Sequence, residues 1–251
     1  MRTSNQRQSH PPSLAGGGCC GRLARARRGL KHMPGRIEPM TDFFTDRLSA
    51  YDEHMLTDIE ELPEAYAVVA RLIPPDAQTL LDLGCGTGLE LERIFELRPD
   101  IRVTGIDLTQ AMLDRLRGKF PGKELTLVCG SYLGRDLGKR VYDAAVSFET
   151  MHHWTYAQKS ALYAGIFKAL KPGGRYVECD YMVDTQDEAD QLFEEALRMR
   201  AEQGVPDGEF YHCDTPMTVD NQTRLFKEAG FASVEKVFRR NGTAIIVCDK
   251  A

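Results

Sequence analysis

The sequence predicts an α/β protein whose parallel sheet ends in an antiparallel hairpin. Between residues 79 and 179, short apolar segments alternate with amphipathic segments of helical spacing. This alternation is typical of right-handed βαβ units and of a parallel sheet covered on both faces. Near the end of the chain, Asn241-Gly242 separates two strand-like runs, and both residues tolerate the positive φ of a two-residue hairpin turn.

The elements follow in order along the chain. We expect helices over 43–56 and 64–73, where apolar residues recur at helical spacing and Pro74-Pro75 ends the second. The sheet should then contain strands over 79–83, 102–106, 124–128, 143–148 and 175–179, alternating with helices over 89–97, 110–119 and 158–170. Lys171 to Gly174 is expected to form a turn. A helix over 219–229 and strands over 232–239 and 243–248 complete the prediction.

Composition divides the chain into a basic leader, residues 1–39, and one domain, residues 40–251. The net charge of −5 separates into +7 over the leader and −12 over the remainder. The leader lacks sustained apolar periodicity, so we expect it to be disordered. Three interpretations are open. The leader is an upstream extension, with Met33 or Met40 as the translation start used, or an organelle transit peptide, or a basic arm that contacts RNA.

The domain's composition narrows the possible partners. No apolar run approaches the roughly 18 residues that a membrane helix needs. The acidic body argues against a broad nucleic-acid footprint, because phosphate neutralisation requires clustered cations. We therefore expect a cytoplasmic protein without membrane contact, monomeric or homodimeric, that acts on a small molecule.

A glycine-rich turn follows the first predicted strand. Gly84, Gly86 and Gly88 have GxGxG spacing, and Leu89 stands where a dinucleotide-binding GxGxxG motif would place its last glycine. Asp107 ends the next strand, where a carboxylate can accept hydrogen bonds from the hydroxyls of a ribose. The pattern indicates a ribose-containing ligand at the carboxyl edge of the sheet and weakens an NAD interpretation.

These residues stand in a series of motifs that resembles the class I S-adenosylmethionine-dependent methyltransferases. The series comprises LLDLGCGTG, GIDLT, YDAAVSFETMHH, LKPGGRYV and KEAGFASVE, and the resemblance covers about residues 43–251. It implies a Rossmann-like, seven-stranded sheet of order 3-2-1-4-5-7-6, with strand 7 antiparallel and helices on both faces. It also implies S-adenosyl-L-methionine as cofactor.

The resemblance further implies the cofactor-binding residues. Asp82, Gly84, Gly86 and Gly88 would line the methionine and ribose end, Asp107 would hold the ribose hydroxyls, and Leu108 would pack on the adenine. Where related enzymes often have Gly-Asp after the third strand, this chain has Gly130-Ser131, so either Ser131 bonds the adenine edge or Tyr132 stacks on it. Other residues of these motifs and of the first helix complete the predicted cofactor site: Tyr51, Cys85, Phe148 and Glu149.

Two histidines after the fourth strand are the catalytic candidates. Methyl transfer from a sulfonium requires an aligned nucleophile and a place for its proton, and His152 or His153 could serve as general base because imidazole titrates near neutrality. We predict no metal site. His212-Cys213-Asp214 could suggest one, but adjacent residues rarely chelate one ion and no distant partner spacing accompanies them.

The predicted function is methyl transfer from S-adenosylmethionine to a small-molecule acceptor. Alternatives are a carboxy-S-adenosylmethionine synthase, for which Arg224 is one residue out of register with the expected cation, an RNA-modifying enzyme, and a non-catalytic scaffold or regulator. The turn-rich segment 204–214 is expected to cover the substrate, since long loops in compact domains are usually functional.

Overall fold

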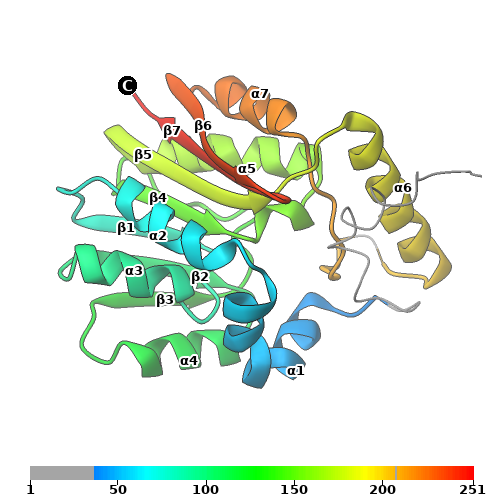
Figure 1. The fold of residues 1–251 in the computed structure, drawn as a ribbon, viewed down its shortest axis with the longest axis horizontal. Coiled ribbons are helices and arrows are strands. Elements are labelled where there is room, and N and C mark those ends of the chain that lie inside the picture. The colour runs from blue at the N-terminus through cyan, green and yellow to red at the C-terminus, as the bar shows by residue number, and fades with distance from the viewer. Residues whose placement is uncertain (1–36, 207) are drawn as a thin grey trace, which may run out of the picture.

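The computed structural model describes residues 37–206 and 208–251 and contains one seven-stranded sheet of order β3-β2-β1-β4-β5-β7-β6 (Figure 1). β7 pairs antiparallel with both β5 and β6, whereas the other pairs are parallel. The predicted order and the hairpin are confirmed. The strands are β1 (Thr79–Leu83), β2 (Arg102–Asp107), β3 (Leu125–Cys129), β4 (Tyr142–Phe148), β5 (Leu170–Tyr181), β6 (Ser233–Arg240) and β7 (Thr243–Asp249).

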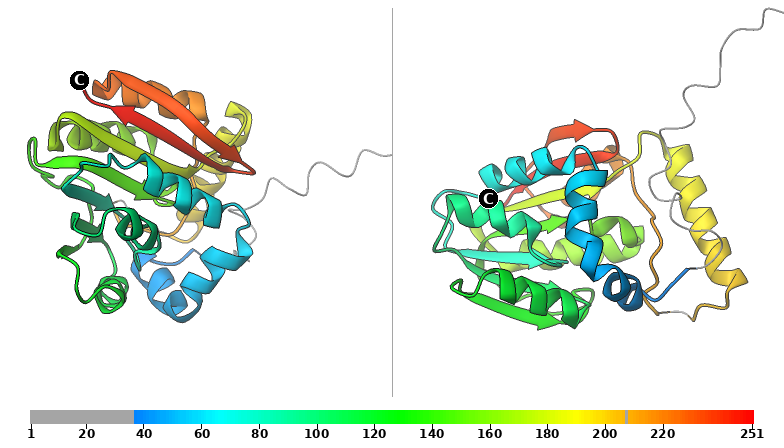
Figure 2. Two further views of the ribbon diagram at one scale, coloured as in Figure 1. Left: turned by 60° about the vertical axis from the view of Figure 1, so that its left-hand side comes forward. Right: turned by 60° about the horizontal axis from the view of Figure 1, so that its bottom comes forward.

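Helices cover both faces of the sheet, because consecutive strand residues point to opposite sides. Leu80 belongs to the apolar cluster formed with α2, α3 and α4, whereas its neighbour Leu81 belongs to the cluster formed with α5 and α7. Figure 2 shows these layers from two further directions. The helices are α1 (Met40–Glu53), α2 (Leu62–Leu72), α3 (Leu89–Leu97), α4 (Gln110–Lys119), α5 (Tyr156–Ala169), α6 (Gln186–Glu202) and α7 (Val219–Ala229), with short helices η1 (His54–Asp58) and η2 (Met151–His153).

Three features differ from the sequence prediction. The first helix does not continue unchanged to residue 56, because its last turn is the π-helix η1. The expected turn at Lys171 to Gly174 is instead part of β5, where the pairing with β4 shifts from Leu170 to Arg175. Residues 37–39, assigned to the disordered leader, are packed, with Ile37 only 2% exposed. The rest of the leader, residues 1–36, lies outside the described residues.

Several segments gather at the edge where the parallel strands end. Figure 1 shows α1 and α6 there, beyond the carboxyl ends of β4 and β5. The residues before α1 pair with the chain that follows α6: Pro39 bridges Tyr211, and the Met40 amide donates to the Phe210 carbonyl at 2.9 Å. These two segments are therefore held together above the strand ends. None of the helices within residues 37–206 and 208–251 has both the length and the apolarity needed to cross a membrane.

Candidate active site

The glycine loop between β1 and α3 takes a backbone path that requires glycine. Gly84 has φ +73°, in the left-handed region, and a Cβ there would lie 2.4 Å from the Thr150 hydroxyl oxygen. The Gly86 amide points to the neighbouring strand end and donates to Asp107 Oδ2 at 3.0 Å. The loop is thus closely packed against both β2 and the chain after β4.

Asp107 ends β2 and lies half-buried beside the loop. Its second oxygen, Oδ1, accepts a hydrogen bond from the Thr109 amide at 2.8 Å. Burial raises the pKa of Asp107, and the bonds from the Thr109 and Gly86 amides oppose that rise. Each carboxylate oxygen has a second lone pair. A fixed acceptor therefore stands at the strand end.

A narrow pocket opens beside this loop and contains most of the predicted cofactor residues. Of the twelve predicted, those that line it are Tyr51, Gly84, Gly86, Asp107, Leu108, Tyr132, Phe148 and Glu149. We call it the cofactor pocket. Glu149 has φ +49°, a conformation that strains a residue with a side chain and that is found mainly at functional sites.

The other four predicted residues do not line the cofactor pocket. The Cys85 sulfur lies against Gly105 in the core, so its side chain does not face the pocket. The Ser131 hydroxyl accepts from the Leu133 amide at 3.0 Å within its own turn, which leaves the pocket wall to Tyr132. Gly88, with φ +74°, turns the chain into α3. Asp82 is completely buried beneath the loop.

Asp82 and Glu90 form a buried pair of acids under the glycine loop. Neither Asp82 oxygen has a hydrogen-bond donor among residues 37–206 and 208–251. Burial, together with Glu90, raises the pKa of Asp82 far above its usual range, and burial raises the pKa of Glu90 to about 7. Because two buried carboxylates repel each other, the pair holds a proton near neutral pH.

This pair predicts a pH-dependent stability. A folded-state pKa above the unfolded value means that the native state binds more protons, so unfolding becomes easier as pH rises through about 7. We expect the wild-type protein to lose stability between about pH 5 and pH 8, and Glu90→Gln, which cannot ionise, to lose less over that interval. Thermal denaturation across the range measures both slopes. Equal slopes would contradict the assignment.

A partly buried tether fixes α1 over the glycine loop. The Thr87 hydroxyl donates to Asp52 Oδ1 at 2.5 Å, and Lys119 Nζ and Arg115 Nη2 of α4 lie 2.8 and 3.2 Å from Asp52 Oδ2. Lys119 and Thr87 help to hold the pKa of Asp52 below its usual value despite its burial. The neighbouring Tyr51 is thereby held at the cofactor pocket.

A larger pocket of about 380 Å³ adjoins the cofactor pocket. The two share Phe44, Tyr51, Glu149 and His153. Aromatic and aliphatic side chains line it together with charged and polar side chains, and α1 and η1 contribute both kinds. We call it the acceptor pocket; its further lining residues are Phe43, Arg47, Ala50, His54, Met55, Asp58, Ile59, His152, Tyr181, His212 and Asp214.

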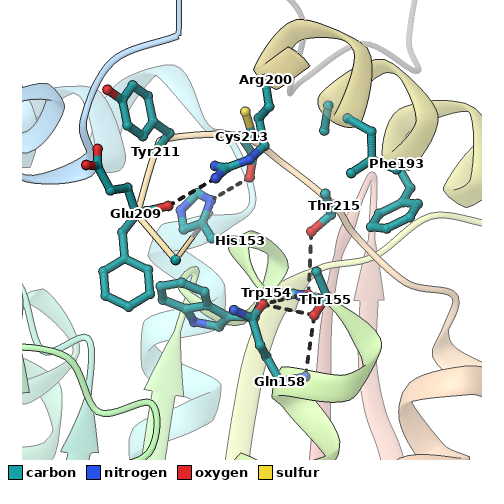
Figure 3. Close-up of a pocket in the computed structure, with 14 residues that line it drawn as sticks. His153, Trp154, Thr155, Gln158, Phe193, Arg200, Glu209, Tyr211, Cys213 and Thr215 are labelled. Carbon is teal, nitrogen blue, oxygen red and sulfur yellow. Dashed lines mark hydrogen bonds between the residues drawn. The ribbon is translucent and has the colours of Figure 1, made fainter. Parts of the chain in front are cut away.

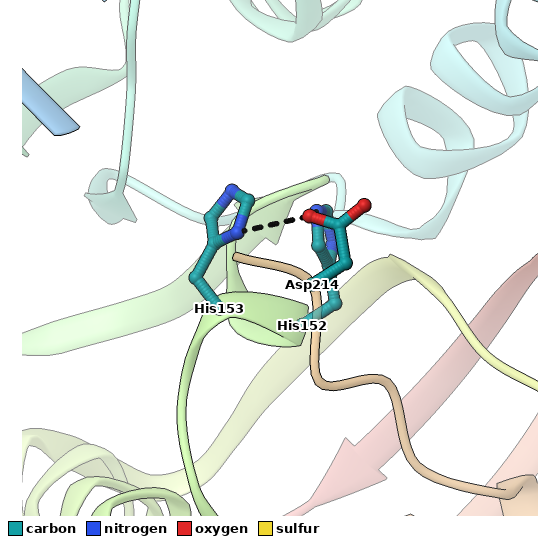
Figure 4. Close-up of side chains that lie close together, drawn as sticks. All are labelled: His152, His153 and Asp214. Carbon is teal, nitrogen blue, oxygen red and sulfur yellow. Dashed lines mark ion pairs between the residues drawn. The ribbon is translucent and has the colours of Figure 1, made fainter. Parts of the chain in front are cut away.

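The polar wall of the acceptor pocket is a cluster of histidines and carboxylates. His152 Nδ1 lies 2.7 Å from Asp180 Oδ1, and Asp214 Oδ1 lies 3.7 Å from His152 Nε2 and 3.4 Å from His153 Nδ1 (Figure 4). Burial alone would lower the pKa of His152, but Asp180, Asp214 and Glu149 raise it to about 9. Burial and His152 lower the pKa of His153. The two predicted histidines are therefore electrostatically distinct.

The segment that carries Asp214 is held from both sides. On one side, the Thr215 amide donates to the His152 carbonyl at 2.6 Å; on the other, Arg200 of α6 donates to the Pro206 and Glu209 carbonyls at 3.2 Å. A third pocket, of about 170 Å³, lies between this segment and α6, and Figure 3 shows Arg200 and Phe193 on its α6 side. His153 and Trp154 line both this pocket and the cofactor pocket.

Sequence reasoning missed three members of this cluster. Asp180 and Asp214 were not predicted as site residues, and His212, whose pKa burial lowers to about 3, was considered only with its immediate neighbours. The premise that Asp214 has no distant partner is wrong, because the fold brings it to His152 and His153. One signal was available, since Asp180 is the next-to-last residue of β5 and lies at the edge where Asp107 ends β2.

Comparisons with known proteins agree with this geometry. Residues 80–174 match the family model described as a methyltransferase domain. A cypemycin N-terminal methyltransferase from a Streptomyces species is 31% identical over 152 residues, which make up 52% of this chain and 56% of that protein. A carboxy-S-adenosyl-L-methionine synthase from Wolinella succinogenes is 27% identical over 191 residues, 71% of this chain and 78% of that protein. For three curated relatives, the aligned part spans 27%, 56% and 78% of the relative's length.

The fold has relatives among solved structures. A putative O-methyltransferase from Nostoc punctiforme superposes with a TM-score of 0.62 at 18% identity, covering 85% of this chain and 62% of that one. Fold and glycine loop define an α/β protein with a fixed carboxylate, Asp107, at the carboxyl edge of its sheet. Together with the methyltransferase domain model that matches residues 80–174, they confirm the resemblance to the class I S-adenosylmethionine-dependent methyltransferases.

Proposed function

We propose that the protein transfers the methyl group of S-adenosylmethionine to a small molecule bound in the acceptor pocket. The observation that carries this proposal is the wall that the two pockets share, formed by Phe44, Tyr51, Glu149 and His153. A cofactor whose ribose lies on Asp107 would extend its methionine end toward that wall. The methyl carbon would then face the acceptor pocket, which suits in-line displacement.

The acceptor pocket supports an acceptor with an apolar body and a polar reacting end. Phe43, Phe44, Met55 and Ile59 provide apolar surface. The histidine and carboxylate cluster adjoins it, with the Phe43 ring stacked on the His212 ring at 3.6 Å. The solved Nostoc relative carries the name of a putative O-methyltransferase, which favours an oxygen acceptor. We place His152 and His153, the catalytic candidates, where that atom would react.

A screen for turnover tests this function. The full chain, incubated with S-adenosylmethionine and a library of phenols, alcohols, amines and carboxylic acids, is expected to release S-adenosylhomocysteine with at least one acceptor class. Ala50→Trp should raise the KM for that acceptor, because residue 50 lines the acceptor pocket, without weakening cofactor binding. Ala201→Trp, on an exposed part of α6, is the matched control. Equal effects of the two substitutions would argue against the acceptor pocket.

Carboxy-S-adenosylmethionine synthesis is the second candidate, because the Wolinella relative with that name aligns over most of this chain. The cation considered for it, Arg224, lies on the exposed side of α7, with its guanidinium 5.5 Å from the Tyr156 ring centre and 3.9 Å from Glu228. It does not reach the cofactor pocket. The mass of the ligand that copurifies with the protein separates the two candidates, and a carboxylated cofactor would favour the second.

A further inference from the structure

We propose that His152, His153 and Asp214 bind one divalent metal ion at the boundary of the acceptor pocket, where it would hold the acceptor's reacting oxygen. The proposal rests on the proposed function for the identity of that oxygen. The metal site itself rests only on the arrangement of the three side chains (Figure 4).

The spacing of the three side chains fits a single ion. One donor atom from each lies within 4.8 Å of the other two. Asp214 Oδ1 is central, at 3.4 Å from His153 Nδ1 and 3.7 Å from His152 Nε2. Ligand atoms that each lie about 2.1 Å from one ion are about 3–4 Å from one another. Closing the site requires side-chain rotations that also release His153 Nδ1 from the Cys213 carbonyl oxygen, 3.3 Å away.

Asp180 orients His152 as a metal ligand. Its oxygen lies 2.7 Å from His152 Nδ1, and the carboxylate is buried at the end of β5. A carboxylate bonded to one ring nitrogen keeps the proton there and directs the lone pair of the other nitrogen outward. In this structure that other nitrogen, Nε2, faces Asp214. Metal-binding histidines commonly donate their other ring N–H to a carboxylate in this way.

Asp214 Oδ1 is paired with the two histidines only at 3.4 and 3.7 Å. This oxygen is buried, yet within the described part of the chain it has no well-oriented hydrogen bond. The neighbouring carboxylates Asp180 and Glu149 add further negative charge, with Glu149 Oε2 at 3.9 Å from His152 Nδ1. A buried charge is costly unless it is paired or coordinates a metal. A dication would neutralise this excess.

Two imidazoles and one carboxylate suit a first-row divalent ion such as Zn²⁺, Mn²⁺, Fe²⁺ or Co²⁺. Three protein ligands leave coordination positions open to the acceptor pocket, which all three residues line. An acceptor hydroxyl held there would lose its proton to water more readily. Its oxygen then bonds to the methyl carbon as the sulfur–carbon bond breaks, which yields the methyl ether and S-adenosylhomocysteine.

Cobalt titration of the chelator-treated full chain tests the site without cofactor or acceptor. We expect one equivalent of Co²⁺ to bind, with the visible absorption of a nitrogen and oxygen donor set. Asp214→Asn and His153→Gln should each weaken binding at least tenfold. The matched control is His54→Gln, because His54 lines the same pocket and pairs with Asp58 at 2.8 Å but lies outside the cluster. Circular dichroism checks that each variant is folded.

Several outcomes would overturn the metal site. These are the absence of stoichiometric binding, or equal affinities in Asp214→Asn, His153→Gln and His54→Gln. Once an acceptor is known, chelation should abolish turnover and added metal should restore it. Chelator-resistant turnover that His153→Gln abolishes would assign His153 as general base instead. If cobalt binds as expected but no acceptor is methylated, the proposed function is wrong and the metal site is not. The two proposals can therefore fail independently.

Discussion

Gly84→Ala is expected to lower the free energy of unfolding by about 2–5 kcal/mol and to abolish measurable binding of S-adenosylmethionine. A left-handed backbone costs a residue with a Cβ about 1–2 kcal/mol. The added methyl group would also meet Thr150 at 2.4 Å, and overpacking of this kind costs about 1–3 kcal/mol more. Relief of the clash would move the loop that forms the cofactor pocket.

Gly173→Ala provides the matched control for this substitution. Gly173 has φ +74°, nearly the same as Gly84, but nothing lies within 4 Å of a Cβ built there. It should show the backbone cost alone and bind the cofactor as the wild-type protein does. Thermal denaturation and calorimetric titration measure the two effects. Similar losses in both variants would show that contact with Thr150 is unimportant.

Asp107→Asn is expected to weaken S-adenosylmethionine binding by about 100-fold or more. The substitution keeps the size of the side chain but turns one acceptor oxygen into a donor group, opposite either the Gly86 or the Thr109 amide. Hydrogen bonds to a charged group contribute about 1.5–3 kcal/mol each, so the loss of one ribose contact and the weakening of the other, now made to a neutral acceptor, are sufficient for this change.

Asp143→Asn controls for the general effect of removing a carboxylate that binds backbone amides. Asp143 Oδ2 accepts from the Gln78 and Thr79 amides, both at 3.0 Å, but it lies near the amino ends of β1 and β4. We expect this variant to lose stability and to keep its cofactor affinity. If Asp107→Asn bound the cofactor normally, the ribose assignment would be wrong.

The sheet and the cofactor edge could be predicted because their signals are local. The strand bounds Thr79–Leu83 and the helix bounds Leu89–Leu97, Gln110–Lys119 and Val219–Ala229 agree with the predicted ranges. The loop glycines and Asp107 stand at strand ends, and parallel strands bring those ends to one edge. The position of Asp107 therefore followed from its place in the alternating pattern.

The acceptor side could not be predicted in the same way. Asp214 and His153 are about sixty residues apart, and they meet because the chain near residue 39 pairs with residues near 211 and because Thr215 bonds to η2. These contacts arise from irregular segments without hydrophobic periodicity. The expected turn at Lys171 to Gly174 is an irregularity within β5, because Leu170 and Arg175 on either side of it both pair with β4 and residues 171–174 fall in the register shift between them.

A crystal structure of the full chain with S-adenosylhomocysteine tests most directly whether the two pockets form one site for methyl transfer. We predict that the ribose hydroxyls bond to Asp107 and that the sulfur lies beside Tyr51, Glu149 and His153, facing the acceptor pocket. A ribose placed away from Asp107, or a sulfur directed away from the acceptor pocket, would contradict the proposed function.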